Sequence, residues 1–190
     1  MNGARLQDLS AVQVAAALGL LPHREGGYFR ETYRSPIIVP TPAGMRPLST
    51  SILYLVSADD PSRFHRLRFD EVWFFHAGSP VEMVFLDPLE THVVGPESPQ
   101  ALAPGGRWMA ARVVPPLAAA GPVASPEAAS AARLPAPEPR EGWGTPTDWA
   151  LVGCVVSPGF EYDDFEAGRA DDLLPATPEA AEYIRDLTGG

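Results

Sequence analysis

Cysteine is almost missing from this sequence: Cys154 is the only one among 190 residues. An internal disulfide is therefore excluded, and we interpret Cys154, inside the apolar run LVGCVV, as a small buried hydrophobic residue. No apolar stretch approaches the ~20 residues that a membrane-spanning helix needs. The opening residues, MNGARLQDLS, lack the basic and then apolar pattern of a signal peptide. We therefore expect a cytoplasmic protein with no membrane partner.

Basic residues are also scarce, at 14 against 24 acidic residues, which gives a formal net charge of -10. Phosphate contacts need clustered Lys and Arg, so this balance argues against DNA or RNA as a partner. No run of like charge suggests an acidic tail, and we interpret the excess acid as a well-solvated surface. The apolar fraction of 45% is enough for one sizeable core.

The chain is dominated by short strand patterns. β-Branched and aromatic residues recur in runs that Gly, Pro and Asp separate, and no helical period competes with them. The runs are residues 49–57, 63–69, 71–78, 81–87, 91–95, 108–114 and 148–157, with an alternating segment at 28–34. Many short strands with regular turn signals predict an all-β sandwich or barrel.

Two helices are expected at the ends of the chain. Ser10 can cap a helix over residues 10–18, and Gly19 can end it. Near the other end, residues 177–187 form a helix pattern with Thr177 as its cap.

Residues 115–147 differ in composition from the rest of the single domain that we predict over 1–190. They are rich in Ala and Pro and poor in large apolar side chains, so we interpret them as an inserted loop. Either the insertion is passive or it forms a lid over the mouth of a pocket.

The segment SRFHRLRFDEVWFFHAG, residues 62–78, raises the question of a metal site. A mononuclear site inside a barrel needs three or four ligands, and two His at i and i+2 of a strand point the same way. Here His65 is followed at i+2 by Leu67, which cannot bind a metal, and Glu71 comes on the next strand. His65 and Glu71 alone would hold a divalent ion weakly.

Four segments resemble, in order and spacing, the cupin family often called cupin-5, formerly a domain of unknown function. They are PHREGGYFRETYRS (22–35), FHRLRFDEVWFFHAGSPVEM (64–83), LVGCVVSPGFEYDDFEAG (151–168) and, more weakly, PGGRWMAA (104–111). Cupin ligands follow the pattern H-x-H-x3-E-x6-G and then P-x-G-x2-H-x3-N. The resemblance therefore places Leu67 and Met109 at two of the four ligand positions, and a thioether is a soft ligand ill suited to the usual metals.

The resemblance implies a cupin jelly-roll barrel with an interior pocket, no cofactor, and a homodimer formed through barrel edge strands. It also implies kinship with the sugar-nucleotide 3,5-epimerases, which are cupins that work without metal. It implies no known activity. The insertion at 115–147 is longer than the connection usual in the family.

A metal-free isomerase, epimerase or lyase needs a base beside a carbonyl group and an acid on the opposite face. His65 is the predicted base, because its ordinary pKa of about 6.5 suits proton transfer near neutrality. Glu71 is expected to approach His65 from the next strand and to orient its ring. Tyr28, Tyr33 and Tyr54 are the candidate acids, and the sequence does not choose among them.

The remaining candidates would bind the ligand. Arg30, Arg34 and Arg63 can hold a carboxylate or phosphate, and Arg63 should share a strand face with His65 and Leu67. The predicted contacts also include Tyr33, the aromatic side chains Phe69, Trp73, Phe75 and Trp108, and Met109.

Each candidate has a plainer alternative. His65 is then a buried structural residue, Trp73 and Phe75 are core, and the arginines bridge Glu25 and Glu31. The turn signals around His23 and His92 predict that both are surface residues.

Three functions follow as hypotheses. The first is a metal-independent isomerase, epimerase or lyase acting on a small polar, anionic or sugar-like molecule. The second is a non-catalytic protein that binds a small molecule in the same pocket. The third is a metal-dependent oxygenase or related cupin enzyme, in which ligands from outside the motif would join His65 and Glu71.

Overall fold

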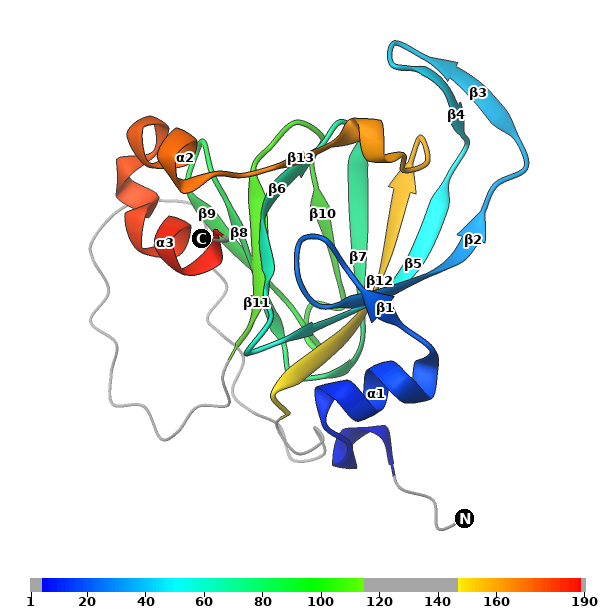
Figure 1. Cartoon of the computed structure of the whole chain (residues 1–190), viewed down its shortest axis with the longest axis vertical. Helices are drawn as coiled ribbons and strands as arrows, with labels where there is room; N and C mark the ends of the chain where they lie inside the picture. The colour runs from blue at the N-terminus through cyan, green and yellow to red at the C-terminus, as the bar shows by residue number, and fades with distance from the viewer. Residues whose placement is uncertain (1–4, 115–146, 189–190) are drawn as a thin grey trace.

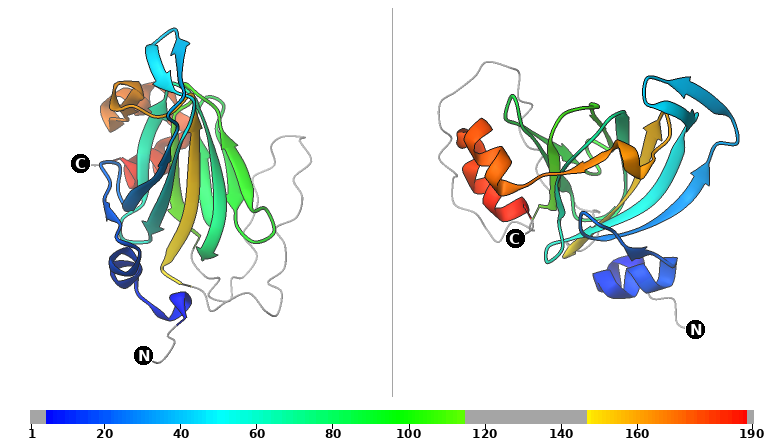
Figure 2. Two further views of the ribbon diagram at one scale, coloured as in Figure 1. Left: turned by 90° about the vertical axis from the view of Figure 1, so that its right-hand side faces the viewer. Right: turned by 45° about the horizontal axis from the view of Figure 1, so that its top comes forward.

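The computed structural model describes residues 5–114 and 147–188, which form two β-sheets that face each other (Figure 1). The six-stranded sheet has the order β1-β2-β5-β12-β7-β10, and the five-stranded sheet has the order β13-β6-β11-β8-β9. A two-stranded arm of β3 and β4 projects beyond β2 and β5 (Figures 1 and 2). The elements are η1 (Leu6–Asp8), α1 (Ala11–Leu18), β1 (Leu21–Pro22), β2 (Tyr28–Arg34), β3 (Ile38–Thr41), β4 (Gly44–Pro47), β5 (Thr50–Ser57), β6 (Ser62–Leu67), β7 (Asp70–Gly78), β8 (Val81–Phe85), β9 (Glu90–Val94), β10 (Gln100–Ala103), β11 (Met109–Val113), β12 (Trp149–Ser157), η2 (Tyr162–Asp164), β13 (Phe165–Ala167), α2 (Ala170–Ala176), η3 (Pro178–Ala180) and α3 (Ala181–Leu187).

From β5 onward the chain crosses repeatedly between the two sheets. Strands β5, β7, β10 and β12 belong to the six-stranded sheet, and β6, β8, β9 and β11 belong to the other. Strands that are neighbours in a sheet pair antiparallel. Two facing antiparallel sheets connected in this way form a jelly roll, so the predicted all-β cupin barrel is confirmed.

Apolar side chains fill the space between the sheets and two smaller spaces outside them. Trp73, Met83 and Met109 are buried in the central cluster. Helix α1 covers Leu55 on the outside of the six-stranded sheet, and helices α2 and α3 cover Phe64 on the outside of the other. Strands with both faces covered need no polar alternation, which explains the almost continuous apolar run of β12.

The first helix agrees with the sequence prediction. The Ser10 hydroxyl accepts a hydrogen bond from the backbone N–H of Gln13, and the Gln13 side chain accepts one from the backbone N–H of Ser10. Gly19 ends the helix with a positive φ of 63°. This reciprocal pair and the left-handed glycine satisfy backbone groups that the helix leaves free at its ends.

The C-terminal helices differ from the prediction in two respects. Helical structure does begin at Pro178, but the side chain of Thr177 makes no capping hydrogen bond. Helix α2 was not predicted, because seven residues that include Pro175 are too few for a helical period to be visible. Its stability comes from packing, since Leu173 is buried in the cluster outside the five-stranded sheet.

The sequence pattern also missed several strands. Pro40 and Pro47 lie in the β3–β4 arm, where edge strands tolerate proline. Strands β10 and β13 are only four and three residues long. Strand β13 pairs with β6.

A β-bulge in β6 decides which of its side chains face the interior. Between the pairs Met109↔His65 and Ala111↔Ser62 the register shifts by one residue. A bulge places two residues against one and changes the alternation of faces. Ser62 and His65 therefore both face inward, whereas the side chain of Arg63 forms an ion pair with Asp60. The prediction that Arg63 shares a face with His65 is wrong for this reason.

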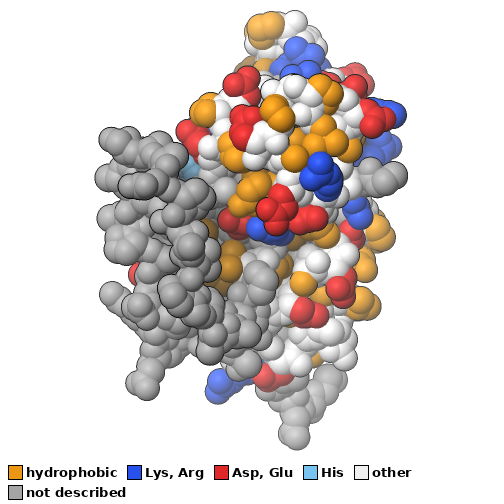
Figure 3. Space-filling view, turned by 90° about the vertical axis from the view of Figure 1, so that its left-hand side faces the viewer, with side chains coloured by type: hydrophobic (Ala, Val, Ile, Leu, Met, Phe, Trp, Pro, Cys, Tyr) orange, Lys and Arg blue, Asp and Glu red, His pale blue; other side chains and the backbone are white. Residues whose placement is uncertain are grey.

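The predicted insertion at 115–147 lies outside the described residues except for Thr147, which is buried and hydrogen bonded to Ser79. On the face that carries α2 and α3, acidic and basic side chains are interspersed among apolar ones (Figure 3). None of the described helices has the length and apolar character required to cross a bilayer.

Gly78 provides a test of the packing at the end of β7. Its φ is 91°, and a Cβ atom there would lie 2.3 Å from the carbonyl oxygen of Trp149. We expect Gly78→Ala to lower the free energy of unfolding by about 2–4 kcal/mol, because the clash adds to the strain of a left-handed backbone. Chemical denaturation measures the loss. Gly106→Ala is the matched control, since φ is 82° and no atom lies within 4 Å of the new Cβ. Equal losses in the two variants would contradict this account.

Candidate functional site

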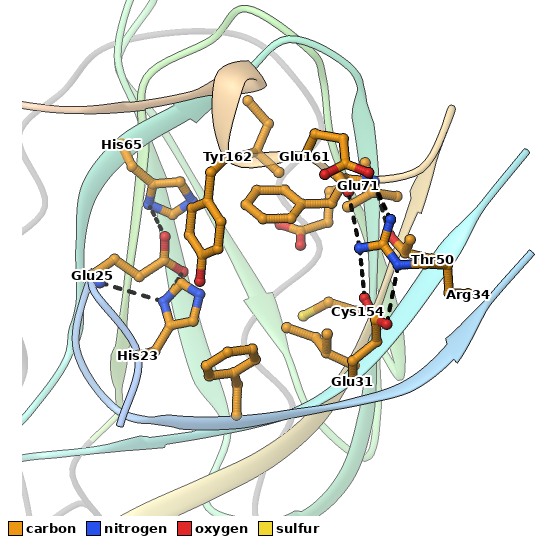
Figure 4. Close-up of a pocket in the computed structure, with 15 residues that line it drawn as sticks. His23, Glu25, Glu31, Arg34, Thr50, His65, Glu71, Cys154, Glu161 and Tyr162 are labelled. Carbon is orange, nitrogen blue, oxygen red and sulfur yellow. Dashed lines mark hydrogen bonds and ion pairs between the residues drawn. The ribbon is translucent and has the colours of Figure 1, made fainter. Parts of the chain in front are cut away.

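A cavity of about 140 Å³ lies between the sheets at the barrel end that η2 crosses (Figure 4). An apolar cavity of ~150 Å³ accommodates benzene, so this one suits a small molecule or the end of a larger one. Its lining consists of His23, Glu25, Phe29, Glu31, Arg34, Thr50, Ile52, His65, Leu67, Glu71, Cys154, Val156, Phe160, Glu161 and Tyr162.

His65 lies on the wall formed by β6 and is only 1% exposed. Its Nδ1 atom is 2.8 Å from the carbonyl oxygen of Arg63 and 3.2 Å from Oε2 of Glu25. A carbonyl oxygen only accepts hydrogen bonds, so Nδ1 carries the proton and Nε2 keeps its lone pair. Figure 4 shows the second ring nitrogen pointing into the cavity. Burial lowers the pKa of His65, although the Arg63 carbonyl and the charge of Glu71 oppose this shift. His65 is therefore a neutral imidazole with a free base nitrogen.

Glu25 reaches His65 because the turn that follows β1 is held tightly against β6. The backbone N–H of Gly27 donates to Asp60, and the backbone N–H of Arg63 donates to the Glu25 carbonyl. A Cβ at Gly26 would lie 2.1 Å from a carbonyl oxygen, which explains the glycine there. Burial raises the pKa of Glu25 to about 8, against the effect of hydrogen bonds to Ser62 and Tyr54. Its carboxyl group is protonated at neutral pH.

Glu71 occupies the opposite wall, on β7 of the six-stranded sheet. The indole Nε1 of Trp73 donates to its Oε2 over 2.7 Å. Burial, followed by the charge of Glu25, raises the pKa of Glu71 to about 7. Burial also keeps Cys154 beside it as a thiol, with its pKa well above the usual value. The expected contact of Glu71 with His65 is replaced by the bond from Trp73, and Glu25 takes the place beside the imidazole.

His23 was missed by the sequence analysis, and the prediction that it is a surface residue is wrong. Its ring packs edge-on against Phe29 with centroids 4.6 Å apart, and its Nδ1 lies 3.6 Å from Glu25. Burial, with smaller contributions from the charges of His65 and Arg24, lowers its pKa to about 4. The Pro and Gly residues around it indicate a turn correctly, but a turn signal describes the backbone and says nothing about what covers it.

Arg34 crosses the mouth of the cavity between two acidic side chains. It donates from Nε and Nη2 to Glu31 and from Nη1 to Glu161, the latter over 2.7 Å (Figure 4). Nearby, the guanidinium of Arg24 lies over the ring of Tyr162, 4.3 Å from its centroid. The predicted bridge to Glu31 exists, whereas the structure shows none from an arginine to Glu25.

Only three of the predicted site residues line the cavity: His65, Glu71 and Arg34. The others do not line the cavity: Tyr28, Arg30, Tyr33, Tyr54, Arg63, Phe69, Trp73, Phe75, Trp108 and Met109. The alternation of β2 explains Tyr28 and Arg30, because Phe29 and Glu31 point inward and their neighbours therefore point outward. The register of β2 shifts between Glu31 and Tyr33, and beyond this irregularity Arg34, in place of Tyr33, lines the cavity. The hydroxyl of Tyr54 donates to the backbone oxygen of Gly26, so its proton is already engaged.

The aromatic candidates belong to the core. Trp73 and Phe75 pack in the cluster between the sheets, in agreement with their alternative interpretation, and Met109 packs in the same cluster. Trp108 packs on the outside of the five-stranded sheet, where the guanidinium of Arg66 covers its ring. No predicted aromatic wall faces the cavity; its aromatic lining is formed by Phe29, Phe160 and Tyr162.

The cavity does not fit the metal centre typical of cupins. Leu67 lines it with an aliphatic side chain, and Met109 is buried in the core. Within residues 5–114 and 147–188 no group of three or more His, Cys, Asp and Glu side chains could hold a metal ion. The donor set of His65 and Glu71 is too small for a mononuclear site.

The buried carboxyl groups make stability depend on pH. An unfolded Glu loses its proton near pH 4.5, whereas folded Glu25 keeps it to about pH 8 and Glu71 to about pH 7. The folded chain thus holds extra protons in this window, and raising the pH favours unfolding. The pKa values of His65 and His23 are lowered in the folded chain, so these residues make stability rise with pH. They do so only below pH 6.5, their unfolded pKa.

We therefore expect the free energy of unfolding to fall by on the order of 1–2 kcal/mol between about pH 6.5 and about pH 8. Chemical denaturation across this range measures the fall. Glu25→Gln should flatten the slope, while the exposed Glu179→Gln should leave it unchanged. A slope that survives in Glu25→Gln and Glu71→Gln would contradict the assignment.

Comparisons with known proteins agree with the fold and with the sequence motifs. The chain is similar to a hypothetical protein from Leishmania major, with 28% identity, a TM-score of 0.74, and coverage of 96% of this chain and 100% of that one. It is similar to a protein from Shewanella oneidensis, with 30% identity, a TM-score of 0.72, and coverage of 95% and 98%. A cupin 2 conserved barrel domain protein from Rhodopseudomonas palustris shares the fold, with 12% identity, a TM-score of 0.51, and coverage of 89% and 88%. A search of curated proteins finds no match.

The family model that matches describes Cupin_5, of the cupin superfamily (DUF985), and it covers residues 12–168. That range contains the three long motif segments, both facing walls of the cavity, and the Glu25–His65 pair. The chain belongs to the Cupin_5 family.

Proposed function

We propose that the cavity is the site of a metal-independent acid–base reaction, an isomerisation, epimerisation or elimination, on a small polar molecule. One observation carries the proposal. The two sheets present a neutral imidazole and a protonated carboxyl group to the same enclosed space from opposite sides.

The geometry supports a proton transfer through these groups. Nε2 of His65 takes a proton from a carbon next to a carbonyl group, and the electron pair of the broken C–H bond moves into the carbonyl. The carbonyl oxygen of Arg63, 2.8 Å from Nδ1, stabilises the imidazolium that forms, and Glu25 adds to this stabilisation once it is ionised. Glu71 can return a proton from the other side, and its pKa of about 7 suits an acid that works near neutrality.

The placement of the arginines changes the ligand class that we favour. We predicted an anionic or sugar-like ligand from Arg30, Arg34 and Arg63. Arg30 and Arg63 do not line the cavity, and Arg34 is already paired with two glutamates. An anion would find no free cation among the described lining residues, so the cavity favours a ligand without negative charge.

Incorporation of solvent deuterium tests the proposal without knowledge of the natural substrate. The protein is incubated in D2O with hydroxyacetone, aminoacetone or pyruvate, and loss of the C–H signal is followed by proton NMR. We expect incorporation faster than in buffer for at least one compound. Folded protein that accelerates none of the three would contradict the proposal and favour a non-catalytic binding protein.

A further inference from the structure

We infer that the ligand of this cavity is a small organic cation, a compound that carries a primary amine next to an acidic C–H group, such as an α-amino ketone. The inference deepens the proposed function by naming its substrate class. Its basis is an imbalance between the acidic groups inside the cavity and the positive charges that could neutralise them.

Among the described residues, the interior of the cavity holds two carboxyl groups, those of Glu25 and Glu71, and no permanent cation. Glu25 is in contact with Ser62 and the rings of His23 and His65, and Glu71 with the indole of Trp73. All these partners are neutral side chains near neutral pH, and none is an arginine. The chain contains no lysine, so no ammonium group of its own can fill this place.

Charges around the mouth do not supply the missing cation. Arg34 is held by Glu31 and Glu161, and Arg24 lies over the ring of Tyr162. At the entrance, the positive charges of Arg34 and Arg24 thus equal in number the negative charges of Glu31 and Glu161. Inside the cavity, Glu25 and Glu71 have no cationic partner among the described residues. Ionisation of either carboxyl group is costly there, because the dielectric constant is low.

A second observation shows where a molecule can bind. The side chain of His65 is 2% exposed, and its Nε2 atom points into the cavity (Figure 4). The Nδ1 atom already contacts the carbonyl oxygen of Arg63, so Nε2 is the ring nitrogen left to accept a hydrogen bond from a ligand or a water molecule.

An ammonium group meets both requirements. Its charge allows Glu25 to ionise while Glu71 keeps the proton that it donates, and its three N–H donors match carboxyl oxygens that accept. The ring of Phe29, which lines the same cavity, adds a face that attracts cations. Nε2 of His65 is then left for the C–H group beside the amine.

Binding of three compounds of nearly equal size tests the inference by calorimetry near neutral pH. They are aminoacetone, a cation; hydroxyacetone, which is neutral; and pyruvate, an anion. We expect aminoacetone to bind at least about tenfold more tightly than hydroxyacetone, with pyruvate weakest. Titrations in two buffers of different ionisation enthalpy should show a proton released with aminoacetone and none with hydroxyacetone, because the cation ionises a buried carboxyl group.

Variants locate the effect. Glu71→Gln keeps an acceptor for Trp73, and Glu25→Gln keeps the size of its side chain. Each should remove most of the preference for aminoacetone over hydroxyacetone. The exposed Glu179→Gln should behave as wild type. Proton release in the wild-type protein keeps the inference testable if either cavity variant fails to fold.

Equal binding of the three compounds, tighter binding of pyruvate, or no binding of any would overturn the inference. The outcome is separate from that of the proposed function. Amine selectivity without deuterium incorporation would retain the ligand class and reject catalysis. Deuterium incorporation into hydroxyacetone, with no binding preference for aminoacetone, would retain catalysis and reject the ligand class.

Discussion

Replacement of His65 by asparagine should lower the rate of deuterium incorporation by about 100-fold or more, the usual contribution of a general base. Asparagine can still donate to the carbonyl oxygen of Arg63, so the strand and the cavity keep their shape. It has no nitrogen that takes a proton near neutrality. Incorporation into the accepted compound, measured by NMR, gives the rate, and calorimetry gives the affinity, which should stay roughly unchanged.

His76→Asn is the control, because His76 is exposed on the same strand as Glu71 and does not line the cavity. It should keep full activity. A purely binding cavity would show a change in affinity alone for His65→Asn. A structural role alone would show only a loss of stability, by roughly 1–3 kcal/mol for a disturbed buried polar group. Full activity and full stability would remove His65 from every functional account.

Replacement of Asp164 by asparagine should cost about 3–5 kcal/mol of unfolding free energy. Asp164 is 7% exposed and receives bonds from Nε and Nη2 of Arg46, over 2.6 and 3.2 Å, and from Nε of Arg68 over 2.9 Å. Burial opposes its ionisation, but these bonds outweigh burial and lower the pKa of Asp164. The variant leaves the guanidinium of Arg46 without its counter-charge, and its side chain is only 11% exposed.

Thermal unfolding should show the loss as a fall in Tm of about 10 °C or more for a chain of this size. Asp163→Asn is the matched control, since this residue is exposed in the same short helix. Adding Arg46→Met to Asp164→Asn should restore part of the stability, because the uncompensated charge is then gone. Similar Tm values for the Asp163 and Asp164 variants would show that the bonds to Asp164 carry little energy.

Local patterns and the resemblance to cupin-5 were sufficient to predict the barrel and one lining residue on each of the two facing walls. The resemblance placed His65 and Glu71 at inward-facing positions, and both are buried there. The alternation of strand faces failed for Arg63, because a bulge changes the alternation and leaves no mark in the residue types. Other residues were assigned to ligand binding from their residue type alone. Of these, Trp108 packs in the cluster outside the five-stranded sheet and Arg30 is exposed on the surface.

The positions of Glu25 and His23 in the cavity depend on contacts between distant segments, which a single sequence does not reveal. Glu25 lies 37 positions from Ser62 and reaches it only because the Gly26–Gly27 turn folds against β6. Its carboxyl group then becomes the partner of His65, a role that the sequence analysis gave to Glu71. The buried state of His23 follows from the same turn, so one tertiary contact accounts for both omissions.

The connection between β6 and β7 consists of Arg68 and Phe69 alone, although the two strands belong to different sheets. His65 and Glu71, the groups to which we assign base and acid, stand on either side of this corner. An enzyme family that needs to alter the spacing of its two reacting groups usually has to rebuild a core. Here a change of one residue in a surface corner would alter that spacing and leave both sheets intact, which makes this corner a natural position for divergence of substrate size and for laboratory evolution.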